Sequence, residues 1–441
     1  MGKKISKSSG VTQGTKKSLK SSSKRTRAIH GQTHSVAWDY NHHIIPPITA
    51  STTFRLESLK RGAQGFSQFA SAPSKDNPQN LPILIYDRLD EPTTMMLEDQ
   101  LADMESAECA VSFGSGMGAI STTILAMVKS GQKVIAHKTL YGCTFSLLTN
   151  WLPRFGVETT FCNLNEDNLA KMFKDPAVRI IYCESVCNPN LEIIDLEKIV
   201  KAIAKENLNR KEENKILFLV DNTFATPWGL RPLEWGVDFS LQSLTKNISG
   251  FGTDMGGAVM TSKKYESTLK IARKDFGAII TAMSAWHILV YGLSSQSLRF
   301  EQQQKNAQQI ANFLEKHKKV KTVLYPGLKS FPQHKLATKY LVSPEGQFAP
   351  GTMIGFILKG NMDTCARFVD EIAKNSYSIT LAVSLGLNKT LIEVPGYMTH
   401  SVYPKDQQES SGISPLLIRL SVGLEHIDDL ISDLTDGLNK I

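Results

Sequence analysis

The sequence predicts an α/β fold with a mostly parallel sheet, followed by a smaller α+β region at the C-terminal end. Between about residues 92 and 290, short and continuously apolar runs alternate with segments of helical spacing. Such runs are typical of strands that a parallel sheet buries on both faces. A Gly-rich turn after one run, and an amphipathic helical segment at 297–317, complete the pattern.

The first 27 residues are basic and poor in large apolar side chains, so we expect a disordered tail at 1–27. Nine of the 50 basic residues lie there and no acidic one does, which leaves 41 basic and 42 acidic residues for the rest of the chain. The body of the protein is therefore close to neutral. The tail is a candidate for contact with nucleic acid or an anionic membrane, but we favour the simpler interpretation of a solvated extension.

Residues 28–85 are predicted to form an irregular arm and not a domain. The adjacent Pro46 and Pro47 and the Gly- and Ser-rich stretch 61–80 leave few periodic apolar positions to pack. From residue 91 the sequence EPTTMMLEDQLADM has helical spacing, and Pro92 suits the first turn of a helix.

The strands of the sheet are predicted from apolar runs, and we assign them to a domain at 86–290. The runs lie at 109–113, 133–137, 178–185, 215–222 and 238–245. A second domain at 291–441 is predicted from the helical segment 297–317, strands near 351–358 and 416–424, and a terminal amphipathic helix.

Several classes of protein are disfavoured by composition. The six cysteines show no disulfide framework, and Cys183 and Cys187, the only close pair, lack partners for zinc. We therefore predict no metal site and a reducing, cytoplasmic location. No apolar stretch follows the basic start as in a secretory signal, and the uncharged stretches 109–128 and 276–295 hold too many small or polar residues for a membrane span.

A Gly-rich turn follows the first strand. Gly114, Gly116 and Gly118 let backbone N–H groups approach an anion, and the N-terminus of the next helix adds positive potential. No GK[ST] sequence follows, and the third Gly comes two residues after the second, so the turn is neither a Walker A loop nor a good dinucleotide fingerprint. A phosphate site and a tight packing turn both remain open here.

Asp221 and Lys246 each follow a predicted strand, at the edge of the sheet where α/β proteins bind ligands. Asp221 can pair with a cationic ring nitrogen, although an Asp before Asn-Thr is also a common turn cap. Lys246, flanked by Ser243 and Thr245, can form an imine if its pKa is lowered, although a lone lysine after a strand is usually a solvated loop residue. The ordered set of phosphate turn, aromatic residue, Asp and Ser-x-Thr-Lys favours the chemistry of pyridoxal 5'-phosphate (PLP).

The motifs SGMGAI, YGCTF, ESVCNPN, VDNTFATP, RPLEWGVD and SLTKNISGFGTDMGG together resemble the Cys/Met-metabolism family of PLP-dependent enzymes, of fold type I. The resemblance covers roughly residues 28–441. It implies a large PLP-binding domain with a mostly parallel seven-stranded sheet and a smaller C-terminal α+β domain. It also implies a homotetramer, a dimer of dimers in which the arm contacts a neighbouring subunit.

The resemblance further implies a role for each site residue. Lys246 carries PLP as a Schiff base, Asp221 pairs with the pyridinium nitrogen, and Tyr141 stacks on the ring. The cofactor phosphate is bound by Gly116, Met117, Ser243 and Thr245. Tyr86 and Arg88 match residues that reach the phosphate of the neighbouring subunit's cofactor. The substrate carboxylate is bound by Arg419, and Asn188 and Ser384 contribute to this binding.

Three features point, within the family, to the methionine gamma-lyases. Cys143 matches a cysteine typical of these enzymes, and Lys274 and Asp275 match their Lys-Asp pair. Val383 stands where cystathionine gamma-lyases tend to have Glu, and an apolar residue there suits a methyl thioether. A packing thiol at Cys143 and an exposed ion pair at 274–275 are the alternatives.

The resemblance therefore implies γ-elimination of L-methionine and related sulfur amino acids to 2-oxobutanoate, ammonia and methanethiol. Lys246 is expected to move the α-proton, and Tyr141 to protonate the leaving thiol. The alternatives on the same cofactor are a cystathionine gamma-lyase and an O-acetylhomoserine sulfhydrylase-type enzyme. A non-catalytic relative that binds nucleic acid through its tail is a third alternative, which the complete set of site residues disfavours.

The chain departs from the family at residues 87–93, where the family commonly reads Ser-Arg-x-x-Asn-Pro-Thr and this chain reads DRLDEPT. We expect the extra carboxylates beside Arg88, Asp87 and Glu91 among them, to weaken cofactor affinity or to alter the subunit contact. The insertion-like segment 70–82 is expected to alter the active-site entrance.

Overall fold

The large sheet has seven strands in the order β1-β7-β6-β5-β4-β2-β3 in the computed structural model, which describes residues 22–30, 44–71, 83–166, 168–404, 408 and 410–441. The five predicted runs form β1 (Cys109–Phe113), β2 (Lys133–His137), β4 (Val178–Glu184), β5 (Leu217–Asp221) and β6 (Phe239–Ser243). β3 (Glu158–Cys162) and β7 (Gly257–Thr261) complete the sheet. Neighbours from β3 to β6 run parallel, whereas β7 is antiparallel to β1 and β6, which confirms the mostly parallel seven-stranded sheet.

Apolar residues point to both faces of the central strands, as the continuous runs predict. Ile180 and Leu219 pack with α5 (Gly116–Met127) on one face, and Ile181 and Phe218 pack with α8 (Leu196–Asn207) on the other. Strand β3 has fewer buried positions because it forms the edge of the sheet. This partial exposure explains why its sequence, ETTFC, does not read as a buried apolar run.

Helix α4 (Pro92–Glu105) begins at Pro92, as predicted. The Glu91 side chain caps this helix, because its carboxylate accepts the N–H groups of Thr93 and Thr94 at 2.9 and 2.8 Å. Burial raises the pKa of Glu91. This carboxylate, which was expected to disturb Arg88, is therefore engaged with the start of α4 instead.

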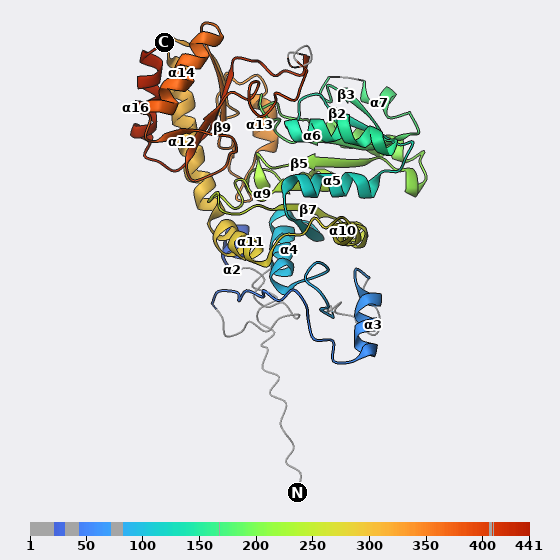
Figure 1. Ribbon diagram of the computed structural model, residues 1–441. Coiled ribbons are helices and arrows are strands. Elements are labelled where there is room, and N and C mark those ends of the chain that lie inside the picture. Colours follow the sequence, from blue (N-terminus) through green and yellow to red (C-terminus); the bar gives the residue numbers. More distant parts are fainter. Residues whose placement is uncertain (1–21, 31–43, 72–82, 167, 405–407, 409) are drawn as a thin grey trace.

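The C-terminal domain contains a five-stranded sheet in the order β10-β11-β12-β9-β8. Its strands are β8 (Val320–Leu324), β9 (Met353–Leu358), β10 (Ile379–Leu381), β11 (Thr390–Glu393) and β12 (Leu417–Ser421). The sheet packs with α12 (Ser294–Lys316), α14 (Met362–Asn375) and α16 (Ile427–Asn439) around a second apolar core. Figure 1 shows α12 running from the large domain into this smaller one.

Six further helices in the described part of the chain connect these elements. They are α6 (Gly142–Ser146), α7 (Leu169–Met172), α9 (Thr226–Gly229), α10 (Lys263–Phe276), α11 (Ala282–His287) and α13 (His334–Tyr340). Residues 288–293 form a π-helical turn that leads directly into α12. Within the described part of the chain, no helix combines the length and the apolar character that a membrane crossing requires.

The predicted disorder of the tail is wrong for its last residues, because α2 (Lys24–His30) is a helix that packs on the body of the protein. Arg25 pairs with Glu301 and Glu345, and the Lys24 ammonium donates to the Asp103 carbonyl at 2.6 Å. Acidic side chains of the body thus bind Arg25, although the sequence around Arg25 contains no acidic residue that would compensate its charge. Residues 1–21 lie outside the described part, so a nucleic-acid contact by the tail stays a prediction.

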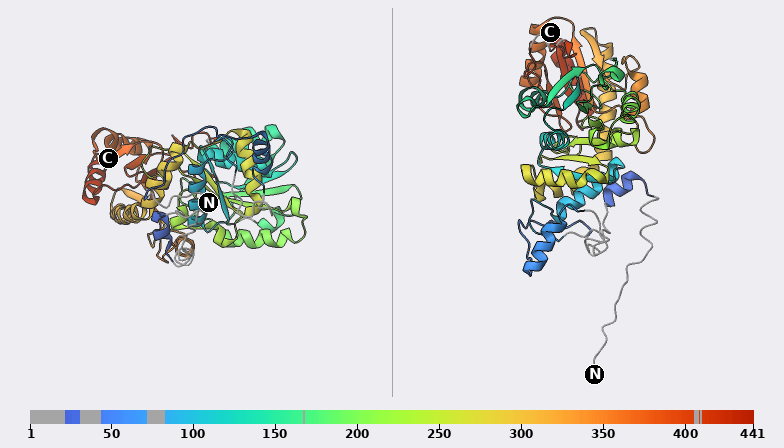
Figure 2. Two further views of the ribbon diagram at one scale, coloured as in Figure 1. Left: turned by 90° about the horizontal axis from the view of Figure 1, so that it is seen from below. Right: turned by 90° about the vertical axis from the view of Figure 1, so that its right-hand side faces the viewer.

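The arm also contains a helix that the sequence did not suggest, α3 (Leu59–Gln68). Ser58 caps it by accepting the Arg61 N–H at 3.1 Å. Figure 2 shows that α3 lies at the end of the molecule farthest from the C-terminus. The insertion-like segment falls largely within residues 72–82, outside the described residues, so its predicted effect on the entrance is untested.

Candidate active site

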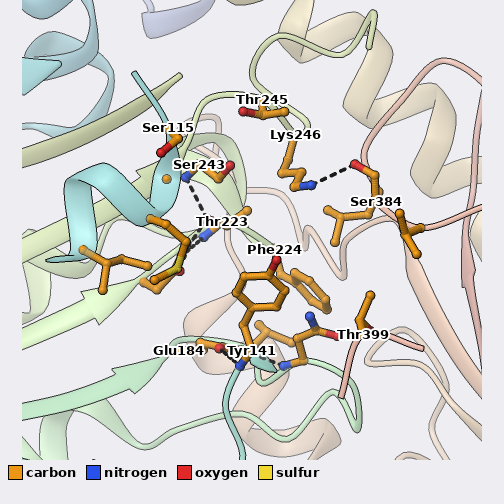
Figure 3. Close-up of a pocket in the computed structure, with 18 of the residues that line it drawn as sticks. Ser115, Tyr141, Glu184, Thr223, Phe224, Ser243, Thr245, Lys246, Ser384 and Thr399 are labelled. Carbon is orange, nitrogen blue, oxygen red and sulfur yellow. Dashed lines mark hydrogen bonds between the residues drawn. The ribbon is translucent and has the colours of Figure 1, made fainter. Parts of the chain in front are cut away.

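A cavity of about 690 Å³ opens where β4, β5 and β6 end, between the N-terminus of α5 and loops of the C-terminal domain (Figure 3). Eleven of the residues predicted for the site line it: Gly116, Met117, Tyr141, Asn188, Asp221, Ser243, Thr245, Lys246, Val383, Ser384 and Arg419. The structure thus brings together side chains that are up to 303 positions apart in the sequence, from Gly116 to Arg419.

Lys246 follows β6 and lies in the cavity, not on a solvated loop. Its ammonium donates to the Ser384 hydroxyl at 2.8 Å. Burial, and then the positive charge of Arg419, lowers the pKa of Lys246, so a larger share of this amine is neutral and nucleophilic than for a lysine in water. Ser384 has a φ of 89°, in the left-handed region that a serine rarely adopts, which marks this loop as strained.

Asp221 ends strand β5 and combines the two roles that its sequence left open. Its Oδ1 accepts the N–H of Thr223 at 2.9 Å and the Thr223 hydroxyl at 2.6 Å, which is a turn cap. The same residue lines the cavity, where burial raises the pKa of its carboxyl. A carboxyl in this position is stabilised in its charged form when a cation comes within contact distance.

The Gly-rich turn also serves both of its proposed purposes. A Cβ on Gly116 would lie 2.7 Å from the Ser243 Cβ, so only glycine lets the start of α5 approach the end of β6 this closely. Ser115 caps α5 by accepting the Gly118 N–H at 3.0 Å. The remaining N–H groups of the first turn, together with the Ser243 hydroxyl, form a concave group of donors beside the cavity.

Thr223 connects the turn of Asp221 to this group of donors. Its hydroxyl donates to Asp221 and accepts the Ser243 N–H at 2.9 Å. Thr245 is held in turn by Gly256, whose N–H it accepts at 3.1 Å. These bonds fix the ends of β5 and β6 relative to each other and to Gly256, which precedes β7.

Tyr141 precedes α6 and places its ring at the wall of the cavity (Figure 3). Burial raises the pKa of its phenol well above the usual range, so Tyr141 is a neutral hydroxyl that can donate a proton. The Cys143 thiol donates to the Tyr141 hydroxyl at 3.3 Å, although Cys143 is exposed and is not among the residues that line the cavity.

Arg419 lies on β12 and is 2% exposed. Its guanidinium donates to the Asn188 side-chain oxygen at 2.7 Å and to the Ser384 carbonyl at 2.9 Å. It also pairs with Glu393 at 2.9 Å. Burial lowers the pKa of Arg419 and the Glu393 carboxylate partly offsets that effect. The predicted carboxylate site is therefore assembled around one well-oriented guanidinium.

Glu184 and Glu393 are site residues that the sequence reasoning missed. The Glu184 carboxylate accepts the backbone N–H groups of Tyr141 and Asn188 and so ties the aromatic wall to the Arg419 site. Burial and the neighbouring Asp221 raise the pKa of Glu184 to about 8. A charged residue at the end of a buried strand was the signal used for Asp221, and it identifies Glu184 equally well. Glu393 ends the buried strand β11, so the same signal identifies it, although its run TLIE is shorter.

Four predicted residues form a second group, outside the lining of this cavity: Tyr86, Arg88, Lys274 and Asp275. The Arg88 guanidinium donates to the Lys274 carbonyl at 2.7 Å and lies 5.6 Å from the centre of the Tyr86 ring. Lys274 pairs with Asp275 at 3.0 Å, as in the alternative interpretation of an exposed ion pair. Within one chain these residues do not contribute to the cavity wall.

Comparison with known proteins gives consistent results for sequence and structure. A family model described as Cys/Met metabolism PLP-dependent enzyme matches residues 25–439. An L-methionine gamma-lyase of Fusobacterium nucleatum subsp. polymorphum is 40% identical over 397 residues, which are 90% of this chain and 93% of the relative.

Solved structures of similar shape point to the same fold. A cystathionine gamma synthase of Xanthomonas oryzae pv. oryzae matches with a TM-score of 0.82 and 28% identity, over 95% of this chain and 98% of the other. A Campylobacter jejuni protein, whose structure contains N'-pyridoxyl-lysine-5'-monophosphate, matches with a TM-score of 0.83 and 30% identity, over 95% of this chain and all of the other.

Proposed function

The chain belongs to the Cys/Met metabolism family of PLP-dependent enzymes, and we propose that it catalyses the γ-elimination of L-methionine to 2-oxobutanoate, ammonia and methanethiol. The family, its fold and its cofactor agree with the sequence predictions. The observation that carries the proposal is the meeting of Lys246, Asp221 and Arg419 in one cavity of a chain that is 40% identical to a methionine gamma-lyase.

The residues of the cavity fit PLP. The helix N-terminus and hydroxyls beside Gly116 suit a phosphate, and a side chain at position 116 would fill that space. The buried Asp221 carboxyl suits a protonated ring nitrogen, and the Tyr141 ring offers an aromatic face. The Lys246 amine, with its lowered pKa, suits covalent attachment to an aldehyde.

The bound cofactor supplies an electron sink, and the chain supplies positioning and proton transfer. Arg419 and Asn188 bind the substrate carboxylate and thereby fix the orientation of its α-carbon. Lys246 moves the α-proton away and, once it is again the free base, takes a proton from the β-carbon, because the bond from the γ-carbon to sulfur can break only when electrons are released at the β-carbon. Asp221 would keep the ring nitrogen of the bound cofactor protonated. Tyr141, a neutral phenol, donates its proton to the sulfur that leaves from the γ-carbon.

The preference for methionine rests on the apolar part of the cavity wall. Val383, Leu385, Met398 and Met255 line it, and none of these side chains offers a partner to a second amino group. A methyl thioether can be buried against them without leaving a polar group unpaired. The Cys143 thiol lies beside the hydroxyl of Tyr141, where it can adjust the orientation of the proton donor.

A second candidate function is a reaction of cystathionine or of an O-acetylhomoserine-type substrate on the same cofactor. The similarity to a cystathionine gamma synthase structure favours this alternative. Val383 is 54% exposed, so the cavity wall beside it is open enough for a longer substrate. Cleavage and formation of the C–S bond use the same Lys246 and Arg419, so these two residues do not distinguish between the reactions.

We also propose a homotetramer in a reducing cytoplasm. Tyr86 and Arg88 are exposed and lie outside the cavity of their own chain, as expected of residues that complete a neighbour's site. Large apolar side chains such as Met283 and Tyr291 are also exposed, which suits burial against another subunit. In the part of the chain that the structure describes, the six cysteines form no disulfide bond with one another. Light scattering on the purified protein would test the tetramer.

Product analysis tests the proposed reaction. The purified protein with PLP should release 2-oxobutanoate, ammonia and methanethiol in equal amounts from L-methionine. The Lys246→Ala variant should lose both this activity and the visible absorption of the lysine-bound cofactor. Wild-type protein that binds PLP but forms no 2-oxobutanoate from methionine would rule the proposal out, and wild-type protein that stays colourless with PLP would rule out the site.

A further inference from the structure

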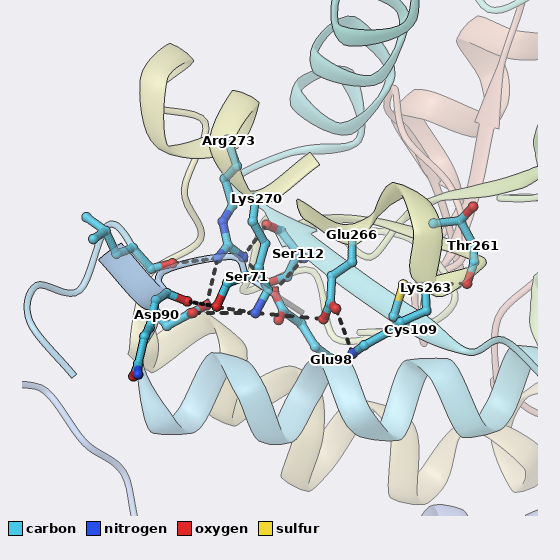
Figure 4. A network of polar contacts seen from close by, with 12 residues as sticks. Ser71, Asp90, Glu98, Cys109, Ser112, Thr261, Lys263, Glu266, Lys270 and Arg273 are labelled. Carbon is cyan, nitrogen blue, oxygen red and sulfur yellow. Dashed lines mark hydrogen bonds and ion pairs between the residues drawn. The ribbon is translucent and has the colours of Figure 1, made fainter. Parts of the chain in front are cut away.

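A buried network of charged side chains joins α10 to the start of α4, outside the cavity (Figure 4). Arg273 and Lys270 extend from α10, towards Asp90 in the loop before α4 and Glu98 within α4. Arg273, Glu98 and Asp90 are 4%, 5% and 8% exposed. The proposed reaction uses none of these four residues, so their burial needs another explanation.

Arg273 holds two segments of the chain at once. Its Nη1 pairs with Glu98 at 2.6 Å and donates to the Ser112 carbonyl at 3.3 Å. Its Nη2 donates to the Leu89 carbonyl at 2.7 Å and pairs with Asp90 at 3.3 Å. A planar guanidinium can make both sets of contacts together, whereas a lysine presents only one charged atom.

The charges of the network are balanced. Burial lowers the pKa of Arg273, but Glu98 and Asp90 outweigh it and hold that pKa above its ordinary value. Lys270 lies 3.2 Å from Asp90 and adds a second cation. A buried network of this kind stabilises a fold no better than apolar packing of the same volume, so its main contribution is the position that it imposes on the loop.

That loop carries Arg88. Leu89 and Asp90, which Arg273 contacts, follow Arg88 directly, and the Asp87 N–H donates to the Thr52 carbonyl at 3.0 Å on the other side. The backbone around Arg88 is therefore held from both sides while its guanidinium is exposed. Lys274, whose carbonyl accepts a hydrogen bond from Arg88, directly follows Arg273 in α10.

We propose that Arg273 is a positioning residue that acts through Leu89 and Asp90. It presents Arg88, and with it Tyr86, to the cofactor phosphate of the neighbouring subunit. The inference rests on the proposed function of Arg88 in the tetramer. Asp90, an acidic residue two positions after Arg88, then supports phosphate binding instead of repelling the phosphate, because Arg273 and Lys270 neutralise its charge.

Cofactor affinity tests the proposal without reliance on turnover. PLP is titrated into the full-length enzyme after removal of the cofactor, and binding is followed by absorbance. Arg88→Ala should weaken binding on the order of tenfold to a hundredfold, the effect of losing a charged hydrogen bond. Asp90→Asn and Arg273→Lys should each weaken it about threefold to tenfold, since Arg88 remains but is less well held.

The double variant Asp90→Asn/Arg88→Ala separates positioning from general destabilisation. If Asp90 acts through Arg88, the double variant should bind PLP no more weakly than Arg88→Ala alone. Glu266→Gln is the matched control, because Glu266 pairs with Lys270 at 3.8 Å and none of its described contacts reaches residues 86–91. Its PLP affinity should equal that of the wild type. Thermal unfolding and light scattering verify that each variant is a folded tetramer.

Three outcomes would overturn the inference. Wild-type affinity in both Asp90→Asn and Arg273→Lys, with a weakened Arg88→Ala, would contradict positioning by Arg273 while leaving the role of Arg88 intact. Additive losses in the double variant would show that Asp90 acts independently of Arg88. Wild-type affinity in Arg88→Ala would remove the premise as well. Each result is separate from a failure of methionine turnover, which would affect only the proposed reaction.

Discussion

Tyr141 receives its properties from two neighbouring side chains and from its burial. Glu184 accepts its backbone N–H, Cys143 donates to its hydroxyl, and burial keeps its phenol protonated. A protonated phenol can act as an acid at neutral pH, whereas an ionised one cannot. The residue is therefore prepared for proton donation before any substrate binds.

Replacing Tyr141 by Phe removes the proton donor and keeps the aromatic face. We expect kcat for methionine to fall by about 10²–10⁴-fold, the usual contribution of a positioned acid or base. PLP affinity, measured by absorbance, should change little because ring stacking persists. A variant with wild-type kcat would show that another group protonates the leaving sulfur.

At the scale of single elements, α2 is held to the body by charge more than by apolar contact, since Ala28 is its only buried residue. Arg25 pairs with Glu345 at 2.8 Å and with Glu301 of α12, and Lys24 donates to the carboxyl end of α4. Cations at the end of a helix complement its dipole. The helix thus connects α4 of the large domain with α12.

Arg25→Ala should loosen α2 selectively. Loss of its partly buried ion pairs corresponds to roughly 1 kcal/mol, so amide hydrogen exchange in α2 should become about fivefold faster. Arg61→Ala is the control, because its pair with Glu57 at 3.7 Å is more exposed, and it should leave exchange in α2 unchanged. Unchanged exchange in Arg25→Ala would show that apolar contacts hold the helix.

Helix α4 carries a carboxyl group that makes stability depend on pH. Burial raises the pKa of Glu105 from 4.5 to about 8. The folded state therefore binds a proton that the unfolded state releases, so this contribution to stability is complete below about pH 4.5 and is lost as pH rises to about 8.

Glu105→Gln keeps the shape of the side chain and removes its titration. The melting temperature of the wild type should fall more steeply between about pH 5 and pH 8, the range between the ordinary and the raised pKa, than that of the variant. Thermal unfolding monitored by circular dichroism gives both curves. Parallel curves would indicate that Glu105 is charged in the folded protein or hydrated.

For the whole molecule, the parts that sequence predicts well are those set by local pattern. The five apolar runs, the start of α4 at Pro92 and the Gly-rich turn follow from period and from residue type, and the structure confirms each. The resemblance to a family predicted the seven-stranded sheet and the residues of the cavity. The apolar runs alone do not indicate which distant residues come together.

The parts that sequence could not predict depend on contacts between distant segments. Glu393 becomes a site residue only because β11 pairs with β12 and sets it against Arg419. Lys24 and Arg25 read as tail residues because their partners, the Asp103 carbonyl and the Glu301 carboxylate, are 79 or more positions away. The pairing of Asp90 with Arg273 could not be predicted, since Arg273 lies 183 positions further on.

The comparison of substrates tests the central claim most directly. In one preparation of the enzyme, kcat/KM for L-methionine should exceed that for L-cystathionine, because the Val383, Leu385 and Met398 side chains in the cavity wall offer no partner to a second amino group. Elimination from methionine should also be faster than thiol addition to O-acetylhomoserine. A higher kcat/KM for cystathionine, or faster formation than cleavage of the C–S bond, would contradict the assignment as a methionine gamma-lyase.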